Sequence, residues 1–371
     1  MIRLPLTLSL YFGRVFAAAV VVMLFALAAL VALFDFLELL RESAMAPQAS
    51  FGIVVEIELL RLPWSFMQIL PFAVLLGGIY AFWRLARSSE LVVARAAGIS
   101  AWQFLAGPVL LACLFGTIAT TVLSPLSAVM YSRAETLDSI YLHFNGGPLW
   151  LNGGVLWVRQ ADTGLTPDGV AVLHARNLRL VGKALQADHV SVLRLDGQNG
   201  FLARIEAAHA TLDPGNWVLT GISILQPDAA PQRAALLNFP TDLTVSRVQE
   251  SFASPDSLSF WALPGFIALL KRSGFSAIQH ELAFQALAAL PLLCATMALV
   301  AAGFSMRPSR RGGAGTMLVS GVGCGFALFM VSEVANQFGT SGAIPVMLAA
   351  WAPSLAGLFL ALALLLHLED G

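Results

Sequence analysis

The 371-residue sequence is too apolar for an ordinary soluble protein. Hydrophobic residues make up 58% of it and charged residues only 12%, against about 25% charged residues in a soluble globular chain. The formal net charge of −1 argues against a nucleic-acid partner. The cysteines, Cys113, Cys294 and Cys324, lie in apolar runs without metal-like spacing. We therefore expect them to be small packing residues, with no disulfide framework and no metal site.

Six uncharged apolar stretches are long enough to cross a bilayer, which takes about 20 residues of helix. They are Val15–Phe34, Leu62–Trp83, Ala96–Ser132, Leu282–Met306, Gly312–Ser332 and Val334–Leu366. The third exceeds one crossing, so we expect it to start late or to extend beyond the bilayer. In the sixth, Asn336–Gly342 is typical of a glycine-rich turn and leaves Ile344–Leu366 as the helix. The segment before the first stretch, Met1–Arg14, is short and basic. The stretch itself is too long for the hydrophobic region of a signal peptide and has no small-residue cleavage pattern, so it is predicted to be retained as a helix.

A polar segment separates the third stretch from the fourth. Residues 133–281 hold 24 of the 43 Asp, Glu, Lys and Arg residues of the chain. Four strands are predicted there: Val155–Gln160, Val170–Arg176, His189–Leu195 and Trp217–Leu225. Turn signals such as Asp196-Gly197 and Asp213-Pro214-Gly215 separate them. The predicted fold is therefore three membrane helices (1–132), an all-β sandwich or jelly-roll domain (133–262) and three more membrane helices (263–371).

Arginines in the short loops predict the orientation, because cytoplasmic loops carry an excess of positive charge. The arginines fall at three places on one side of a six-span chain: Arg3 and Arg14; Arg84, Arg87 and Arg95; and Arg307, Arg310 and Arg311. Both termini are therefore expected in the cytoplasm and the β domain in the periplasm.

The loop between the second and third spans is predicted to form a short amphipathic helix at residues 87–99. Ser88 or Ser89 is a plausible N-cap, Glu90 lies in the first turn, and Gly98 closes the helix. One mixed apolar and charged face is predicted to hold Leu91, Val92, Arg95 and Ile99. Periodicity alone leaves two interpretations open: a helix resting in lipid headgroups, or a helix that couples the membrane spans to a cytoplasmic partner.

This loop also carries a family resemblance. Its pattern Ser-Glu-Leu-Val-Val-x-x-Ala-x-Gly, at residues 89–98, resembles the signature of the LptF/LptG permeases of the lipopolysaccharide exporter. Ser259–Ile267, Glu281–Pro291 and Gly339–Pro353 resemble the family's entries to its fourth and sixth spans, and the layout of three spans, β domain and three spans matches over the whole chain. Asp35–Leu40 and Trp351–Pro353 look more like LptG than LptF.

The resemblance implies an inner-membrane ABC transporter subunit that extracts lipopolysaccharide from the outer leaflet. The implied partners are the paralogous permease LptF, a cytoplasmic LptB ATPase dimer, and the periplasmic bridge protein LptC, with LptA beyond it. The implied ATPase-coupling residues are Ser89, Glu90, Leu91, Val92, Arg95 and Gly98. The sequence agrees that ATP hydrolysis belongs to a partner, because its two lysines, Lys183 and Lys271, do not lie in a P-loop. No cofactor is expected on this chain.

Substrate-cavity candidates follow from the same resemblance. Phe25, Leu33, Phe326 and Phe329 are expected to form apolar walls for acyl chains. Asp35, Glu38 and Arg41 at the outer end of the first span are either simply solvated or form a rim for the phosphorylated headgroup. LptG relatives often carry a basic residue near position 34 or 35, and this sequence departs from that. Glu333 is expected to pair with Arg41 or Arg61, or to face water.

Two other functional classes are open to a membrane chain of this kind: a lipid-modifying enzyme and an envelope scaffold. His280-Glu281 begins an HExxH pattern, but Phe284 stands where the second histidine is needed. No G-x-S-x-G elbow occurs, so no catalytic residue is proposed. Trp150, Trp157 and Trp217 are either strand core or a ligand platform. The strands of the β domain are expected to meet a similar β protein edge to edge.

Overall fold

The computed structural model divides into two compact units. It describes residues 6–44, 49–96, 98–142, 149–152, 155–162, 169–181, 184–196, 200–227, 229–241, 243–244, 254–272, 275–305 and 314–370. The helical unit comprises Met1–Leu142, Pro255–Pro264 and Ile278–Gly371, and the β unit comprises His143–Ser254 and Gly265–Ala277. The boundary expected at residue 133 lies inside a helix that continues to Tyr141.

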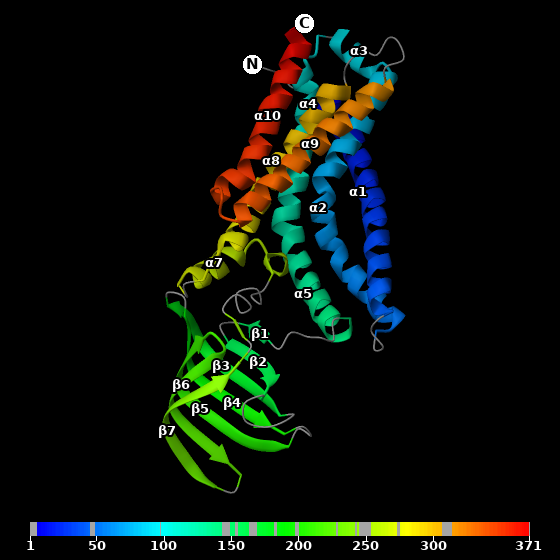
Figure 1. Cartoon of the computed structure of the whole chain (residues 1–371). Helices are drawn as coiled ribbons and strands as arrows, with labels where there is room; N and C mark the ends of the chain where they lie inside the picture. Colours follow the sequence, from blue (N-terminus) through cyan, green and yellow to red (C-terminus); the bar gives the residue numbers. More distant parts are fainter. Residues whose placement is uncertain are drawn as a thin grey trace. The chain divides into compact units, whose positions relative to one another are not determined.

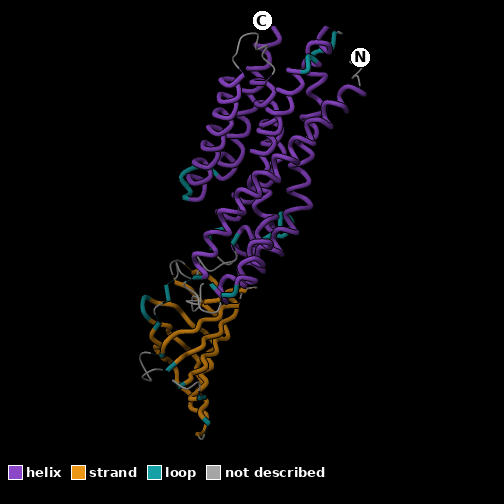
Figure 2. The backbone as a smooth tube through the Cα atoms, turned by 90° about the vertical axis from the view of Figure 1, so that its right-hand side faces the viewer, coloured by secondary structure: helices purple, strands orange, loops and turns teal. Residues whose placement is uncertain are grey.

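The helical unit is built from long apolar helices (Figure 1). Its elements are α1 (Leu6–Ser43), α2 (Phe51–Arg87), α3 (Glu90–Ala96), α4 (Ala101–Ile118), η1 (Ala119–Leu123), α5 (Ser124–Tyr141), η2 (Pro255–Ser257), α8 (Ile278–Ser305), α9 (Ala314–Thr340) and α10 (Val346–Asp370). Within the described residues, six candidate spans are long and apolar enough to cross a membrane, which confirms the predicted number. The start of α1, the whole of α3 and the end of α10 lie at one end of this unit (Figures 1 and 2).

Small residues let the first two spans approach closely, as helices in a membrane require. A Cβ atom added to Gly77 of α2 would lie 2.6 Å from the Cα atom of Val20 on α1. Phe12 and Phe16 of α1 and Phe82 of α2 fill the core around this contact. Any side chain at position 77 therefore forces α1 and α2 apart.

The third span is a single continuous helix of 37 residues, Trp102–Asp138. This helix is longer than one crossing needs, which agrees with the predicted alternative that the stretch extends beyond the bilayer. Its middle contains the π-helical turn η1. There the Thr120 hydroxyl donates a 2.8 Å hydrogen bond to the carbonyl oxygen of Leu287 on α8. Pro291, four residues on, has no N–H to offer that carbonyl. Thr120 therefore satisfies a backbone group that lipid could not.

The last connection differs from the predicted turn. Asn336–Gly342 was expected to be a turn, but α9 continues through Thr340 and the turn lies at residues 341–345. Gly339 stays helical because α10 and α8 pack on it: an added Cβ atom would lie 2.7 Å from that of Ala349. The glycine at this position serves close packing, which a composition-based turn signal does not distinguish from a turn.

The β unit is one curved antiparallel sheet (Figure 2). Its strands are β1 (Leu149–Asn152), β2 (Val155–Ala161), β3 (Val170–Val181), β4 (Ala184–Leu195), β5 (Phe201–Asp213), β6 (Asn216–Gln226) and β7 (Ala229–Pro240). The all-β class is confirmed. The connectivity is a meander, β1 to β7 in sequence order, and not the crossing connections of a jelly roll. At most eight residues separate each strand from the next, which favours pairing of sequence neighbours.

One face of the sheet is buried around Trp217 and Phe239. Leu270 of α7 (Leu263–Arg272) and the following Phe275 belong to this core. The prediction missed β5 and β7 because both are rich in alanine, which has a low strand propensity. Burial in β5 nevertheless alternates along most of the strand, as expected for a sheet with one covered face.

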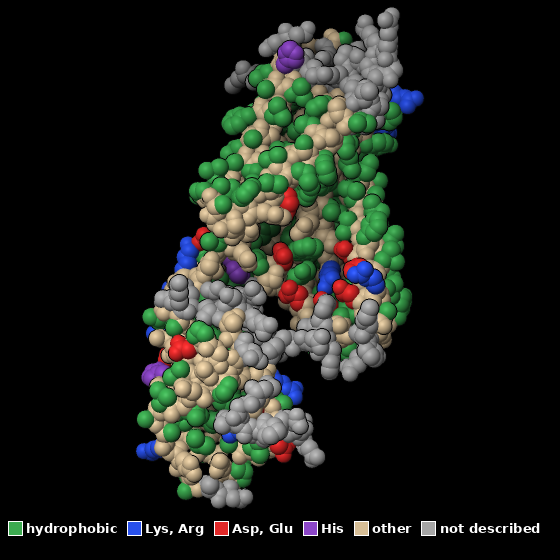
Figure 3. Space-filling view, viewed as in Figure 1, with side chains coloured by type: hydrophobic (Ala, Val, Ile, Leu, Met, Phe, Trp, Pro, Cys, Tyr) green, Lys and Arg blue, Asp and Glu red, His purple; other side chains and the backbone are tan. Residues whose placement is uncertain are grey.

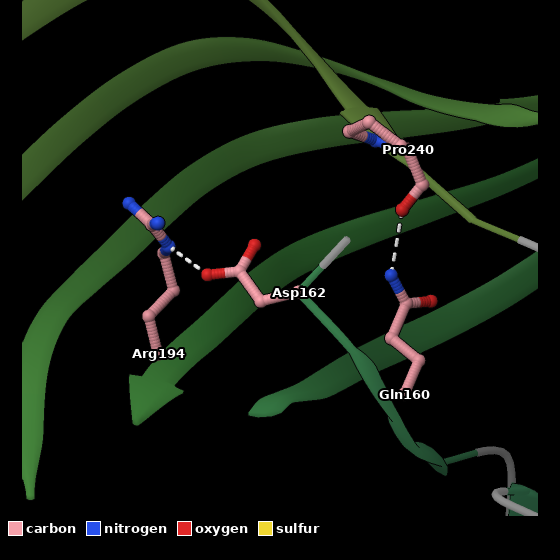
Figure 4. Close-up of polar contacts among 4 residues, drawn as sticks. All are labelled: Gln160, Asp162, Arg194 and Pro240. Carbon is pink, nitrogen blue, oxygen red and sulfur yellow. Dashed lines mark hydrogen bonds and ion pairs between the residues drawn. The ribbon is translucent and has the colours of Figure 1, made fainter. Parts of the chain in front are cut away.

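Side chains join strands that are not neighbours in the sheet (Figure 4). Gln160 at the end of β2 donates a 2.6 Å hydrogen bond to the carbonyl oxygen of Pro240 at the end of β7. Thr241 donates a 2.6 Å hydrogen bond back to the Gln160 carbonyl oxygen. Next to them, Arg194 of β4 donates to Asp162, whose side chain is only 1% exposed. These contacts hold the curled sheet together at this end.

Candidate functional site

The predicted amphipathic helix is present as α3, between the second and third spans. It is bounded by two residues with left-handed backbone, Ser89 (φ 62°) and Gly98 (φ 79°). The Ser89 carbonyl oxygen accepts the hydrogen bond from the Val93 amide. Ser89 therefore caps the helix through its backbone, while Ser88 ends α2. Gly98 tolerates a positive φ without strain, which explains how the chain turns so sharply into α4.

Glu90 is held by its own chain. The Ser88 hydroxyl lies 2.8 Å from Glu90 Oε1, and the Tyr11 hydroxyl of α1 hydrogen bonds to the same carboxylate. The Glu90 side chain is half-buried. These contacts fix a carboxylate at the junction of α1, α2 and α3, where it is positioned before any partner arrives.

The rest of α3 divides into an inner and an outer side. Leu91 is buried in the core of the helical unit, and Ile99 packs against the same core. Val93 is 66% exposed, although the predicted face omitted it. The side chains of Val92 and Arg95 lie outside the described part of the structure. Leu91 and Ile99 thus anchor the helix, and the outer side that includes Val93 is the one open to a partner.

Charged side chains gather at the end of the helical unit opposite α3 (Figure 3). Arg61 of α2 donates a 2.9 Å hydrogen bond to Asp138 of α5, and Arg41 pairs with Glu38 at 2.8 Å. Neither arginine therefore pairs with Glu333 in the described structure. Glu333 is exposed, and the pairing considered from the sequence is not formed.

Sequence reasoning missed a buried carboxylate in this region. Glu58 of α2 is only 7% exposed, and neither of its carboxylate oxygens has a hydrogen-bond partner among the described residues. Asp35 and Arg61 are the charged groups that interact electrostatically with the Glu58 carboxylate. The available signal was a carboxylate between the apolar residues Ile57 and Leu59, since burying such a group without a donor is costly.

The apolar wall candidates lie on two helices that both pack on α2. The Phe25 ring of α1 lies 5.6 Å from the ring of Phe66, and the Phe329 ring of α9 lies 4.6 Å from that of Phe72. Leu33 on α1 and Phe326 on α9 are more than half exposed. The two groups therefore contact different parts of α2, and no ring contact joins them among the described residues.

The tryptophans of the β unit do not share one environment. Trp217 is fully buried in the sheet core. Trp157 is 49% exposed, with its ring 4.3 Å from that of His174. Burial of His174 and the nearby Arg176 and Arg204 lower the pKa of its imidazole. The side chain of Trp150 lies outside the described residues.

Known proteins match this sequence over nearly the whole chain. The family described as "Lipopolysaccharide export system permease LptF/LptG" matches residues 10–367. LptG of Haemophilus influenzae is 24% identical over 354 residues, covering 94% of this chain and 95% of that protein. LptG of Escherichia coli K12 is 24% identical over 369 residues, covering 97% and 98%. Both relatives are the paralogue that the sequence features favoured. With six candidate spans and an inserted β sheet, this multi-pass inner-membrane chain belongs to the LptF/LptG family of lipopolysaccharide export permeases.

Proposed function

We propose that this chain is the LptG-like half of an ABC transporter that extracts lipopolysaccharide from the outer leaflet of the inner membrane. The single observation that carries the proposal is the prepositioned carboxylate of Glu90 on α3. A short helix between two spans, anchored by Leu91 and exposed on its outer side, is suited to dock a cytoplasmic ATPase dimer. The paralogue LptF then supplies the other wall of the lipid cavity.

In this proposal the termini and α3 are cytoplasmic and the β unit is periplasmic, as the arginine distribution indicates. Exposed apolar side chains of α1 and α9, including Phe25, Leu33 and Phe326, would face the acyl chains. ATP-driven closure of the ATPase dimer would act on α3 and the spans attached to it. The lipid would then leave toward the β unit.

The β unit would pass lipid to a bridge protein through an outer strand. Two of the predicted strands, His189–Leu195 and Val155–Gln160, are each paired on both sides, the latter by β1 and β3, so neither offers a free edge. Among the described strands, β1 and β7 are the outer ones, and β7 is the longer, at 12 residues. Its Leu236 is 57% exposed. A strand of this length offers enough backbone groups for edge-to-edge pairing.

The coupling role is tested at Glu90 with controls that the structure supplies. Glu90→Lys should lose co-purification with the ATPase dimer, because truncating one member of a buried charged pair typically costs about 2–5 kcal/mol of binding. Tyr11→Phe and Ser88→Ala remove the intrachain partners of Glu90 but keep the carboxylate. They should retain association if the carboxylate contacts the partner. Equal losses in all three variants would show that Glu90 only fastens α3, and full retention in Glu90→Lys would remove the coupling role.

A further inference from the structure

The helical unit contains a cavity of about 250 Å³, whose lining includes Phe329 and Glu333 from the substrate-cavity candidates. It lies among α2, α8, α9 and α10, with the start of α5 and the η2 segment contributing at one end. Its volume falls just below the range of about 300–1,000 Å³ typical of drug-sized ligands. The space therefore suits a fragment-sized molecule or one short hydrocarbon chain.

The cavity begins where α9 moves away from α2. Leu75 of α2 lies against Gly325 of α9, and Phe72 and Phe329 are in ring contact one turn further along. Beyond this ring pair, Glu333 and Asn336 of α9 line the cavity. Of the six candidate spans, α9 has the smallest buried share, 11% of its apolar window. A ligand here would add contacts to the most weakly packed span.

The cavity is lined by apolar residues along its walls and by acidic residues at its polar end. Met67, Leu290, Leu293 and Phe329 supply the apolar surface. Both ionisable lining residues, Asp256 and Glu333, are acidic, and no lysine, arginine or histidine is among the described lining residues. A ligand that reaches the polar end therefore meets negative charge.

The same end also has an acceptor without a donor. The Oδ1 atom of Asn336 is buried and has no hydrogen-bond partner among the described residues. A buried acceptor left unpaired costs about 1–3 kcal/mol, and a donor entering the cavity relieves that cost. Carboxylates and an unpaired carbonyl oxygen together select a cationic hydrogen-bond donor over an anion.

We propose that this cavity is a binding site for a single-chain amphiphile bearing a protonated primary amine. The hydrocarbon chain packs against Leu290, Leu293 and Phe329, and the ammonium group donates hydrogen bonds toward Glu333 and Asn336. The site belongs to one subunit. It does not depend on the proposed extraction mechanism, because it needs no paralogue and no ATPase.

The test uses the full chain in phosphatidylcholine nanodiscs and a decylamine probe with a diazirine on the chain. Photolabelling followed by peptide mass spectrometry should place the label on α8 and α9. Unlabelled decylamine should compete at least about tenfold better than decanoate, since a charge-assisted hydrogen bond is worth about 1.5–3 kcal/mol. Equal competition by amine and carboxylate, or label spread evenly over the exposed spans, would overturn the proposal.

Variants separate the cavity from general partitioning into the bilayer. Glu333→Gln should weaken decylamine competition by about tenfold or more, whereas Glu38→Gln, an exposed acid paired with Arg41 outside the cavity, should not change it. Ala283→Phe, which places a ring in the cavity lining, should abolish site-specific labelling. Unchanged competition in Glu333→Gln, in a variant that remains monodisperse, contradicts the assignment. Repeating the labelling with phosphatidylethanolamine in the nanodisc shows whether a lipid headgroup amine occupies the same site.

Discussion

At the scale of single residues, some of the buried charges have a close partner of opposite sign. Asp162 and Arg194 form such a pair in the β unit, 2.7 Å apart and 1% and 15% exposed. Removing one member of a buried pair leaves the other charge uncompensated, which is far more damaging than losing a surface pair. Stability of the β unit should therefore depend on this pair and much less on its exposed ion pairs.

Asp162→Asn tests this dependence. It should lower the free energy of unfolding of the β unit by about 3–5 kcal/mol, seen as faster proteolysis of the β unit in the full chain. Glu206→Gln is the matched control, because Glu206 pairs with Arg204 at a site where both side chains are about half exposed. That control should change stability by less than about 1 kcal/mol. Equal sensitivity of both variants would show that burial does not set the strength of these pairs.

His174 gives the β unit a dependence on pH. Its pKa is lowered by burial first and by Arg176 and Arg204 next, so the folded state binds the proton more weakly than the unfolded state. The stability associated with the neutral imidazole is present above the unfolded-state pKa of about 6.5, and is lost as pH falls through the lower folded-state pKa. NMR titration of His174 should give a value below about 6.5, and His174→Gln should reduce the acid sensitivity. A pKa at or above the ordinary value would contradict the packing described around Trp157.

At the scale of elements, prolines and polar side chains explain how the spans remain paired in lipid. Thr120→Val removes the hydrogen bond to the Leu287 carbonyl oxygen that Pro291 leaves without its helical donor. The cost should be about 0.5–2 kcal/mol, the range for hydrogen bonds between membrane helices. Thr117→Val is a close control, since among the described residues the Thr117 hydroxyl bonds within its own helix, to the carbonyl oxygen of Cys113.

Unfolding of the full chain in mixed micelles should separate these two variants. A Thr120→Val stability equal to that of Thr117→Val would mean that the carbonyl of Leu287 is satisfied in some other way. The π-helical turn would then have no role in joining the third span to α8.

The elements differ in how well the sequence predicts them. The six spans were predictable because twenty apolar residues without charge have few other stable locations than a bilayer. The end of α9 was not, since the glycine signal at Gly339 arises from close packing against Ala349. The alanine-rich β5 and β7 were missed because their pairing with β6, and not their own propensity, makes them strands.

In the candidate site, too, the sequence predicts some features and not others. The position of α3 and of Glu90 followed from the motif, but the contacts of Glu90 with Ser88 and Tyr11 depend on a residue nearly eighty positions away. The cavity beside Glu333 and Asn336 was not predictable either, because it arises where several helices meet, which no local pattern describes.

At the scale of the whole molecule, the arginines of the short loops predict the orientation of the spans. A reporter fused at Gly98, beside α3, should be cytoplasmic, and one inserted at Gly215, in the turn between β5 and β6, should be periplasmic. Alkaline phosphatase is active only after export and green fluorescent protein only when it folds inside, so the pair gives opposite signals. Phosphatase activity at Gly98 would reverse the topology and separate α3 from ATP.

The central claim is that this chain couples ATP hydrolysis by a partner to lipopolysaccharide extraction. The most direct measurement is ATP hydrolysis by the chain reconstituted in proteoliposomes with its paralogous permease and ATPase dimer, with and without lipopolysaccharide. Lipopolysaccharide should stimulate hydrolysis in the wild-type complex, and Glu90→Lys should lose that stimulation while still inserting into the membrane. Hydrolysis that is indifferent to lipopolysaccharide in the assembled wild-type complex would contradict the claim.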